Sequence, residues 1–311
     1  MNTNSRQQSV KINRLEDLLE AARSKGKRKL VVAHAQDVHT LEAVSDAVDH
    51  GIAEATLIGD PAVIREVCEQ KGLDYGKFAM IAETSDVKCV ETAVRMANGG
   101  IADVVMKGLV STDKYMRGIL NKEYGLVPPR GILSHAIVLQ LPGYRKLLVV
   151  SDVAVIPYPD LGQKTAMIRY LIEMARAIGI ERPKVACIAP SEQLLPGMSS
   201  STEAALLAKM GERGQFGDAV VDGPLALDVA MFPEIAAVKK LQGSEIGGDA
   251  DCLLFPNLDA ANVFFKCVTR LNKSDLAGLV VGTRVPCVLT SRADTRLSKL
   301  YSIALGCLTA K

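Results

Sequence analysis

Apolar runs alternate with amphipathic stretches along the first third of the chain. Residues 29–35 (KLVVAHA) form a continuous apolar run that predicts a buried strand, and residues 38–50 carry apolar side chains at helical spacing. The same pattern predicts further strands at 55–59, 78–82 and 103–106 and helices at 61–71 and 86–98. Because alternating strands and helices are typical of βαβ units, we expect an α/β protein with a mostly parallel sheet.

The pattern changes beyond residue 125. Two prolines in residues 125–131 (GLVPPRG) exclude a helix there, whereas residues 163–179 predict a strong amphipathic helix. Further apolar runs and strands are expected at 132–141, 147–151, 185–189, 219–221 and 252–255. The tail, 285–310, reads as a strand and a helix that could return to the first sheet, which places a second domain near 141–280.

Composition narrows the classes of function. Of the 311 residues, 48% are hydrophobic and 23% are charged, which is ordinary for a globular protein with a sizeable core. A net charge of +2 gives no electrostatic case for a nucleic-acid or membrane-surface partner. The chain has no apolar run of about 18 residues that could span a membrane and no apolar signal segment at its start. We therefore expect a cytoplasmic protein.

The seven cysteines predict neither disulfides nor zinc. Their number is odd and no CxxC pair occurs. Most of them lie in apolar runs, where a cysteine is usually a small buried hydrophobe. We therefore expect reduced cysteines that contribute to the core.

Polar residues follow the predicted strand at 103–106. Open parallel sheets bind ligands beyond the carboxyl ends of their strands. Here Lys107 ends the strand, and Ser111 and Thr112 open the next helix. A lysine beside a helix start would suit an anion, but Ser111 or Thr112 could equally do no more than cap the helix.

The segment TSRAD follows the apolar run at 285–289 and precedes an amphipathic helix. Ser291 and Asp294 fit an acidic capping box. Arg292 would then face the positive end of the helix dipole, at a cost of a few tenths to about 1 kcal/mol. A bound anion would offset that cost, so a helix cap and an anion site are both open.

Two other segments carry polar side chains after strands. Asp222 with Gly223 reads either as a turn or as a carboxylate available as a base. Asn262, Lys266 and Arg270 are four residues apart and share one face of a helix. That face is either solvated or directed at a polyphosphate.

The histidines and the standard motifs exclude several classes of enzyme. Histidines 34, 39, 50 and 135 show no metal-binding spacing, and His135 lies in an apolar run where we expect a core histidine with satisfied hydrogen bonds. No Walker loop, GxGxxG or GxSxG motif occurs. These absences argue against P-loop kinases, typical Rossmann dehydrogenases and α/β-hydrolases.

Taken together, several segments resemble the phosphate acetyl/butyryltransferase family over nearly the whole chain after about residue 28. Their order and spacing are specific, although each is weak alone. The SRAD form and a length near 300 are closer to the butyryl branch. The segments are ADVVMKGLVST (102–112), VSDVAVIPYPD (150–160), VVDGPLALDVA (220–230), LLFPNLDAANVFFK (253–266) and VPCVLTSRADTRLSK (285–299).

The resemblance implies a fold and a reaction. The fold would have two α/β domains, resembling the isocitrate/isopropylmalate dehydrogenase-like fold, with the active-site cleft between them. The first domain would contain residues 1–140 plus 281–311, and the second, 141–280, would be the dimerisation domain of a homodimer. The reaction would be acyl-CoA plus phosphate giving acyl phosphate plus coenzyme A, reversibly, through a ternary complex. Coenzyme A would be a substrate, with no metal, acyl-enzyme or permanently bound cofactor.

The resemblance also implies roles for individual residues. Ser291 and Arg292 would bind the phosphoryl oxygens and polarise the thioester, and Arg270 would be an active-site arginine. Arg130 would match a further substrate arginine. We count Lys107, Ser111, Asp222, Asn262 and Asp294 as substrate-binding candidates. Where the acetyltransferases have an aspartate proposed as the base for the thiol, this chain has Ser298. The nearest carboxylate, that of Asp294, is not assigned as the base.

Two other readings stay open. A β-decarboxylating dicarboxylate dehydrogenase would share the architecture, but we find neither its metal-binding aspartate cluster nor a nicotinamide site. A non-catalytic module that binds coenzyme A or a nucleotide is the second. The sequence does not decide whether the acyl group is acetyl or butyryl, since each methylene contributes only about 1–3 kcal/mol of discrimination.

Overall fold

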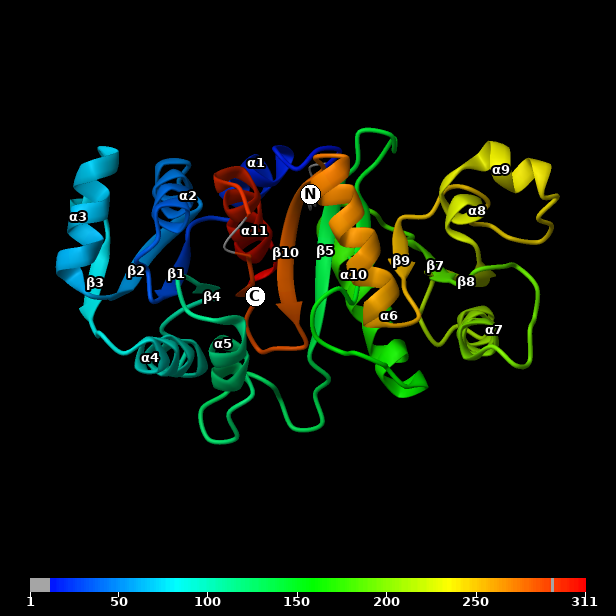
Figure 1. The fold of residues 1–311 in the computed structure, drawn as a ribbon, viewed down its shortest axis with the longest axis horizontal. Helices are drawn as coiled ribbons and strands as arrows, with labels where there is room; N and C mark the ends of the chain where they lie inside the picture. Colours follow the sequence, from blue (N-terminus) through cyan, green and yellow to red (C-terminus); the bar gives the residue numbers. More distant parts are fainter. Residues whose placement is uncertain (1–11, 292–293) are drawn as a thin grey trace, which may run out of the picture.

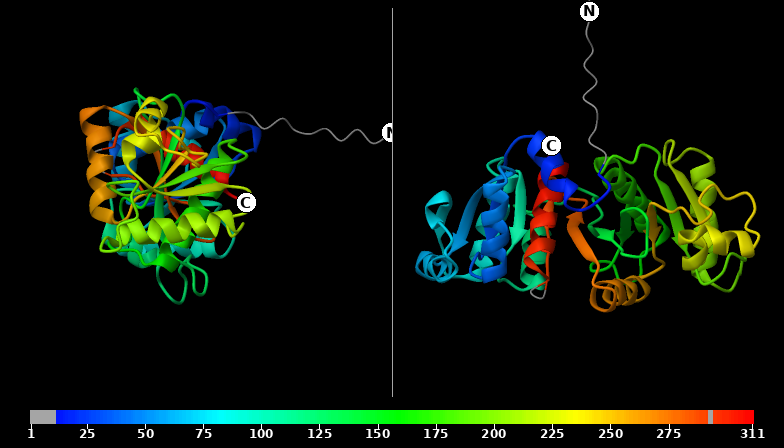
Figure 2. Two further views of the ribbon diagram at one scale, coloured as in Figure 1. Left: turned by 90° about the vertical axis from the view of Figure 1, so that its right-hand side faces the viewer. Right: turned by 90° about the horizontal axis from the view of Figure 1, so that it is seen from above.

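The apolar runs of the chain assemble into a single mixed sheet. The computed structural model describes residues 12–291 and 294–311. Within them the strands form one 11-stranded sheet in the order β3-β2-β1-β4-β11-β10-β5-β6-β9-β7-β8 (Figure 1). The views in Figure 2 show a molecule that is long in the direction of this strand order and narrow across it.

Each end of the sheet is parallel. The first half-sheet contains β3 (Ala79–Ala82), β2 (Ala53–Gly59), β1 (Arg28–Ala33), β4 (Val104–Lys107) and β11 (Cys287–Val288). The second half-sheet contains β6 (Leu148–Ser151), β9 (Cys252–Leu254), β7 (Lys184–Ile188) and β8 (Val220–Leu225). The predicted α/β fold with a mostly parallel sheet is confirmed.

Two central strands reverse the chain direction between these halves. β10 (Asp275–Val281) is antiparallel both to β11 and to β5 (Ser134–Gln140), and β5 is antiparallel to β6. Three antiparallel contacts in succession mean that the two half-sheets run in opposite directions. The carboxyl ends of their strands therefore lie at opposite edges of the sheet.

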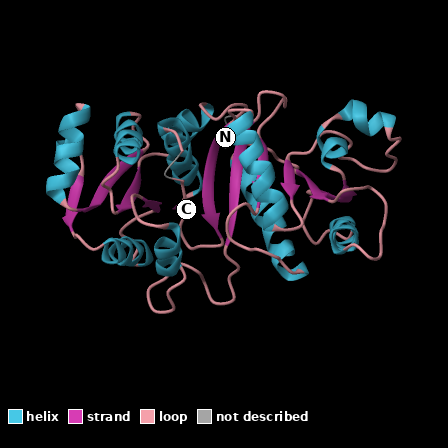
Figure 3. Ribbon diagram, viewed as in Figure 1, coloured by secondary structure: helices cyan, strands magenta, loops and turns pink. Residues whose placement is uncertain are grey.

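Helices cover both faces of the sheet (Figure 3). One face carries α1 (Asp17–Ser24), α2 (Val38–Asp49), α3 (Pro61–Lys71), α6 (Leu161–Ala177), α7 (Ser199–Glu212) and α11 (Arg296–Thr309). The other carries α4 (Asp86–Asn98), α5 (Thr112–Ile119), α8 (Leu227–Met231), α9 (Pro233–Val238) and α10 (Leu258–Lys266). A 3-10 turn covers Tyr75–Lys77, and a π-helical turn, Cys267–Leu271, continues α10.

The hydrophobic core is continuous on one face and divided on the other. Under α1, α2, α6, α7 and α11 one cluster of buried residues extends across both half-sheets. On the opposite face, one cluster lies under α4 and α5 and a separate cluster lies under α8, α9 and α10. The sheet face between these two clusters is the place where a cavity can form.

The sequence located most elements but missed several, among them α1, α8, α9 and β10. The helices predicted at 61–71 and 86–98 have the same bounds in the structure, and the tail returns to the first half-sheet, where β11 pairs with β4. The sequence prediction assigned neither α1 nor the central strand β10. Gly278 in the middle of β10 weakens the strand pattern because it contributes no side chain. The division into two domains stays a prediction.

Two further predictions concern membranes and cysteines. Within the described ranges no helix is long and apolar enough to cross a membrane. Six of the seven cysteines are buried, as predicted, and Cys267 is exposed on the π-helical turn. Burial raises the pKa of Cys187 to about 12, which keeps that thiol protonated.

Gly108 allows the segment after β4 to pack against the end of β1, and we predict that Gly108→Ala destabilises the fold. An added Cβ would lie 2.7 Å from the Ala33 carbonyl oxygen and closer still to that of His34. Because both obstacles are backbone atoms, the cost should be about 1–3 kcal/mol of unfolding free energy, measured by urea denaturation.

Gly143→Ala is the matched control, since no atom lies within 4 Å of its added Cβ. It should stay within about 1 kcal/mol of the unchanged protein. Equal stability of the two variants would show that the close approach at Gly108 is not a constraint.

Candidate active site

A cavity of about 530 Å³ lies on the divided face of the sheet, and we call it the central groove. It is open to solvent and combines a mostly apolar floor with walls that carry both polar and apolar side chains. The floor is formed by His135, Ile137, Leu276 and Leu289. Four segments form the walls: Val110, Ser111 and Thr112 at the start of α5; Val153 and Ala154 after β6; Asn262, Phe265 and Lys266 of α10; and Thr290, Ser291 and Asp294 before α11.

The end of β4 supplies two of the predicted residues. Lys107 is only 3% exposed, and its Nζ donates to the carbonyl oxygens of Gly108 and Val110 at 3.3 and 3.1 Å. Ser111 is the N-cap of α5, because its hydroxyl accepts from the Lys114 N–H at 3.3 Å. The capping interpretation of Ser111 is therefore confirmed, and the same residue also lines the central groove.

The segment before α11 differs from the predicted capping box. α11 begins at Arg296 with Thr295 as N-cap, and the Thr295 hydroxyl accepts from the Ser298 N–H at 3.1 Å. Ser291 lies further upstream, where its N–H donates to Asp294 Oδ2 at 2.7 Å. The reading of Ser291 as the cap of this helix was wrong, and its backbone instead joins a short loop on the groove wall. Arg292 lies outside the described residues.

A second buried lysine supports this loop. Lys299 is 3% exposed, and its Nζ donates to Thr290 Oγ1 at 3.1 Å and to the Ser291 carbonyl oxygen at 3.3 Å. Burial lowers the pKa of Lys299, although the nearby carboxylates of Asp37 and Asp294 oppose that shift. Lys299 and Lys107 also share a smaller cavity of about 160 Å³ at the start of α2. The sequence analysis missed Lys299, whose only signal is a lysine within an apolar helix.

The polar face predicted for α10 is only partly formed. Asn262 and Lys266 line the central groove, and Asn262 Nδ2 donates to the Val153 carbonyl oxygen at 2.9 Å. Arg270 is exposed on the π-helical turn and is not among the described groove residues. A π turn bonds residue i to i+5, so the four-residue spacing of an α-helix no longer aligns side chains there.

The structure does not bring Arg130 and Asp222 to the groove. Arg130 is exposed in the loop before β5. The first residues of β5 lie level with the start of β4, whereas Lys107 lies at the end of β4. Arg130 is therefore at the opposite edge of the sheet from Lys107. Asp222 lies in β8, at the far end of the sheet (Figure 1), where its Oδ1 accepts from the Gly223 N–H at 2.7 Å. The Asp-Gly turn expected there was wrong. Arg130 precedes a strand that runs in the same direction as β4, and Asp222 lies on the edge strand of the sheet, several strands from the groove.

The structure also corrects the expectation that His135 is a core histidine with satisfied hydrogen bonds. It is 5% exposed in β5, as expected for a core residue, but neither ring nitrogen has a hydrogen-bond partner within the described part of the chain. Burial lowers the pKa of His135, and the charges of Asp152 and Asp294 partly oppose that effect. It is therefore an unsatisfied polar group on the floor of the groove rather than a satisfied core histidine.

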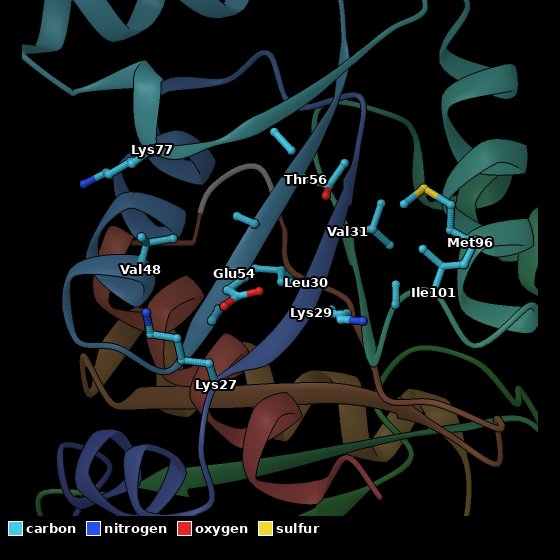
Figure 4. A pocket seen from close by; sticks show the side chains of 14 residues that line it. Lys27, Lys29, Leu30, Val31, Val48, Glu54, Thr56, Lys77, Met96 and Ile101 are labelled. Atoms are coloured by element: carbon cyan, nitrogen blue, oxygen red, sulfur yellow. The ribbon is translucent and has the colours of Figure 1, made fainter.

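Another cavity, of about 500 Å³, lies at the amino-terminal ends of β1 and β2 (Figure 4). Lys27, Lys29, Glu54 and Lys77 project around it, and Lys77 pairs with Asp49 at 2.7 Å. None of the predicted site residues lines this cavity. Lys107 pairs with Ala33 at the carboxyl end of β1, so the amino-terminal end of β1, where this cavity lies, is far from the groove. We therefore place the candidate site in the central groove.

The described residues also bear on metal binding. No group of three or more His, Cys, Asp or Glu side chains in 12–291 and 294–311 is arranged to hold a metal ion. The polar groups of the groove are instead lysines, hydroxyls, an amide, an imidazole and one carboxylate. Such a set suits an anionic substrate with a reactive carbonyl.

Known proteins share the sequence and the fold. The model of the phosphate acetyl/butaryl transferase family matches residues 14–95 and 82–307. The phosphate butyryltransferase of Clostridium acetobutylicum is 42% identical over 96% of this chain and 99% of its own length. The phosphate acetyltransferase of Thermotoga maritima is 38% identical over 95% and 99%. A branched-chain phosphotransacylase from Enterococcus faecalis superposes with a TM-score of 0.79 at 26% identity, over 91% of this chain and 98% of that one.

Burial of Lys299 predicts a pH-dependent stability difference. Its pKa in the folded protein lies below the ordinary value of 10.5, so Lys299 releases its proton at lower pH in the folded protein than in the unfolded chain. Between those two pKa values the unfolded chain binds the extra proton, and stability therefore rises with pH. Relative to Lys299→Met, the unchanged protein should gain stability on the alkaline side, as measured by urea denaturation at several pH values up to 10.

The exposed Lys122 provides the control, because Lys122→Met should give a pH dependence parallel to that of the unchanged protein. A Lys299→Met curve that is also parallel would contradict the inferred cost of burying this ammonium group.

Proposed function

The chain belongs to the phosphate acetyl/butaryl transferase family, and we propose that the central groove is where it transfers an acyl group between coenzyme A and inorganic phosphate. The protein is a phosphate acyltransferase. It converts acyl-CoA and phosphate into acyl phosphate and coenzyme A, and catalyses the reverse reaction. One observation carries the placement of the site: Lys107, Ser111, Asn262, Ser291 and Asp294 come from three distant segments and line one cavity.

Charge is the first problem that this site must solve. Phosphate and coenzyme A are both polyanions, so their approach is repulsive. The ammonium groups of Lys107, Lys266 and Lys299 lie at or beside the groove, and two of these lysines are buried, where solvent screens them less. They would lower the repulsion and hold both substrates in a ternary complex.

The chemistry needs orientation and a site for the oxyanion. A phosphate oxygen attacks the thioester carbonyl, the carbonyl oxygen becomes an oxyanion, and the C–S bond then breaks with its electron pair leaving on sulfur. Donors at the start of α5 and in the loop at Ser291 lie on the groove walls, where they could stabilise that oxyanion. Ser291, Arg292 and Arg270 remain our predicted catalytic residues, and of these Ser291 lines the groove. Arg270, Arg130 and Asp222 remain predictions that the groove geometry does not support.

We also propose a domain organisation for this site. In it, the groove is the cleft between a first domain, 1–140 plus 281–311, and a second, 141–280, in a fold related to the isocitrate/isopropylmalate dehydrogenases. The split core on the groove face supports this division. We further propose a cytoplasmic homodimer that uses coenzyme A as a substrate. The dehydrogenase and the non-catalytic module are not favoured.

A thiol-release assay tests the proposed function. Acetyl-, propionyl-, butyryl- and branched-chain acyl-CoA are each incubated with the protein, with and without phosphate, and free thiol is measured. Release that depends on phosphate and is matched by acyl phosphate formation is expected for at least one of them. Release at the same rate without phosphate, or none with any acyl group, would reject the proposal.

Arg292→Ala should reduce turnover by orders of magnitude, because the guanidinium is predicted to bind the phosphoryl oxygens in a bidentate manner. The thiol-release rate and the midpoint of thermal unfolding are measured together. Arg213→Ala removes an exposed arginine just beyond α7 and should change neither. Near-normal kinetics in a folded Arg292→Ala variant would exclude this residue from the site.

Ser111→Ala separates capping from substrate binding. Ser85 is the N-cap of α4, on the same face, and accepts from the Lys88 N–H, but it does not line the groove. Both alanine variants should lose about 0.5–2 kcal/mol of stability, whereas only Ser111→Ala should raise the KM for phosphate, by about tenfold. If KM changes equally in both variants, Ser111 has no role beyond the cap.

A further inference from the structure

His135 is placed as a reactive group rather than as a packing residue. It lies on the floor of the central groove and is almost wholly buried, yet neither ring nitrogen makes a hydrogen bond within the described residues. The Leu289 carbonyl favours the protonated ring but does not meet the geometry of a hydrogen bond. A buried polar group without a partner costs about 1–3 kcal/mol, so its retention needs a reason.

Backbone contacts fix the position of this ring, and both of its nitrogens are buried without a hydrogen-bond partner in the described residues. The His135 N–H donates to Asp152 Oδ2 at 3.3 Å, and the same carboxylate accepts from the Ser134 hydroxyl and from the N–H groups of Ala154, Val155 and Ile156. On the neighbouring strand stands Gly278, where an added Cβ would lie 3.4 Å from His135 Nε2. Because Gly278 has no side chain, no atom from this position packs against Nε2.

The other groove residues are poor candidates for a base near neutral pH. Ser298, at the position where the acetyltransferases have an aspartate, is buried in the first turn of α11, and its hydroxyl lies 3.1 Å from that of Thr295. The Asp294 carboxylate already accepts from the Ser291 N–H. A lysine side chain has an ordinary pKa near 10.4, far above neutral pH. Imidazole is the side chain whose ordinary pKa lies closest to that range.

Charged groups face His135 from several elements. Asp152 after β6 and Asp294 before α11 raise its pKa, while burial lowers it by more. Lys107 at the end of β4 and Lys266 on α10 line the same groove, and β10 brings the uncharged residues Leu276, Gly278 and Val280 to this region. The ring is therefore neutral at pH 7, which is the form that can accept a proton.

We propose that His135 is the proton acceptor and donor for the thiol of coenzyme A, an inference that rests on the proposed function. When coenzyme A attacks an acyl phosphate, the S–H bond breaks and its proton forms an N–H bond on the imidazole. The sulfur electron pair forms the C–S bond, and the C–O bond to phosphate breaks with its pair leaving on phosphate. In the opposite direction the imidazolium returns the proton to the departing thiolate.

The need for a base follows from the chemistry of the thiol. With an ordinary pKa near 8.5, only a few per cent of the thiol is ionised at pH 7. A positioned base contributes about 10²–10⁴-fold to such a step.

The test measures kcat/KM for coenzyme A, with butyryl phosphate or acetyl phosphate, between pH 5.5 and 9.5. In the unchanged protein activity should fall on the acid side, as His135 gains a proton below its ordinary pKa of 6.5. His135→Gln should lower kcat/KM by about 100-fold or more at pH 7, lose that acid limb, and recover most of the loss by pH 9.5, where the thiol ionises by itself.

His50→Gln is the matched control, because His50 is exposed at the end of α2, away from the groove, and its profile should match that of the unchanged protein. A His135→Gln profile that is reduced by the same factor at every pH would overturn the inference, since a structural defect has that form. If the unchanged protein forms no thioester from either acyl phosphate, the proposed function fails instead.

A measurement on the unchanged protein covers the case in which His135→Gln does not fold. The chain has four histidines, so the His135 ring signal of ¹³C-histidine-labelled protein can be assigned by elimination, using His34→Gln, His39→Gln and His50→Gln. This signal should titrate below pH 6.5 and shift when coenzyme A is added. A ring signal that neither titrates nor responds to coenzyme A would overturn the inference.

Discussion

The antiparallel pairing of β10 with both β11 and β5 determines how the rest of this molecule is arranged. Together with the β5–β6 pairing it joins two parallel half-sheets that run in opposite directions, so their carboxyl ends cannot meet at one edge. On one face of the sheet, α4 and α5 cover the first half-sheet and α8, α9 and α10 cover the second. Between these two groups of helices, over β5 and β10, the core divides into two clusters. The central groove lies between these clusters, and its floor is therefore the sheet itself rather than the loops at a strand edge.

Within the groove, binding and chemistry use buried polar groups that are expensive to maintain. Lys107 and Lys299 are held on backbone carbonyls and a hydroxyl, which satisfies some of their donors while their side chains stay buried. Burying such charges opposes folding, yet it makes them effective toward a polyanion because water screens them weakly. His135 is likewise a buried polar group whose burial opposes folding, although its ring is uncharged. The stability lost here is compensated by the continuous core on the other face.

Much of the fold was predictable because it depends on local patterns. The helices Pro61–Lys71 and Asp86–Asn98 carry strong caps and regular apolar spacing, and their bounds agreed with the structure. β10 was not predicted, since Gly278 interrupts its apolar pattern and its role depends on partners far away in the chain. For the site, Lys107, Ser111, Asn262, Ser291 and Asp294 do converge. Arg270, Arg130 and Asp222 are not among the groove residues, because residue spacing shows neither a π turn nor the place of each strand in the sheet.

By itself the sequence determined the α/β class, the family and the chemical types of residue available for the reaction, since these depend on local periodicity and on motifs that can be read in order. Only the tertiary structure decided which of those residues share a cavity. It turned His135 from an expected packing residue into an unsatisfied group that lines the groove, and it brought in Lys299, whose position in an apolar helix carried no distinctive signal. Both outcomes depend on which strands pair and in which direction, and pairing between distant strands is an energetic balance over the whole chain that no short segment encodes.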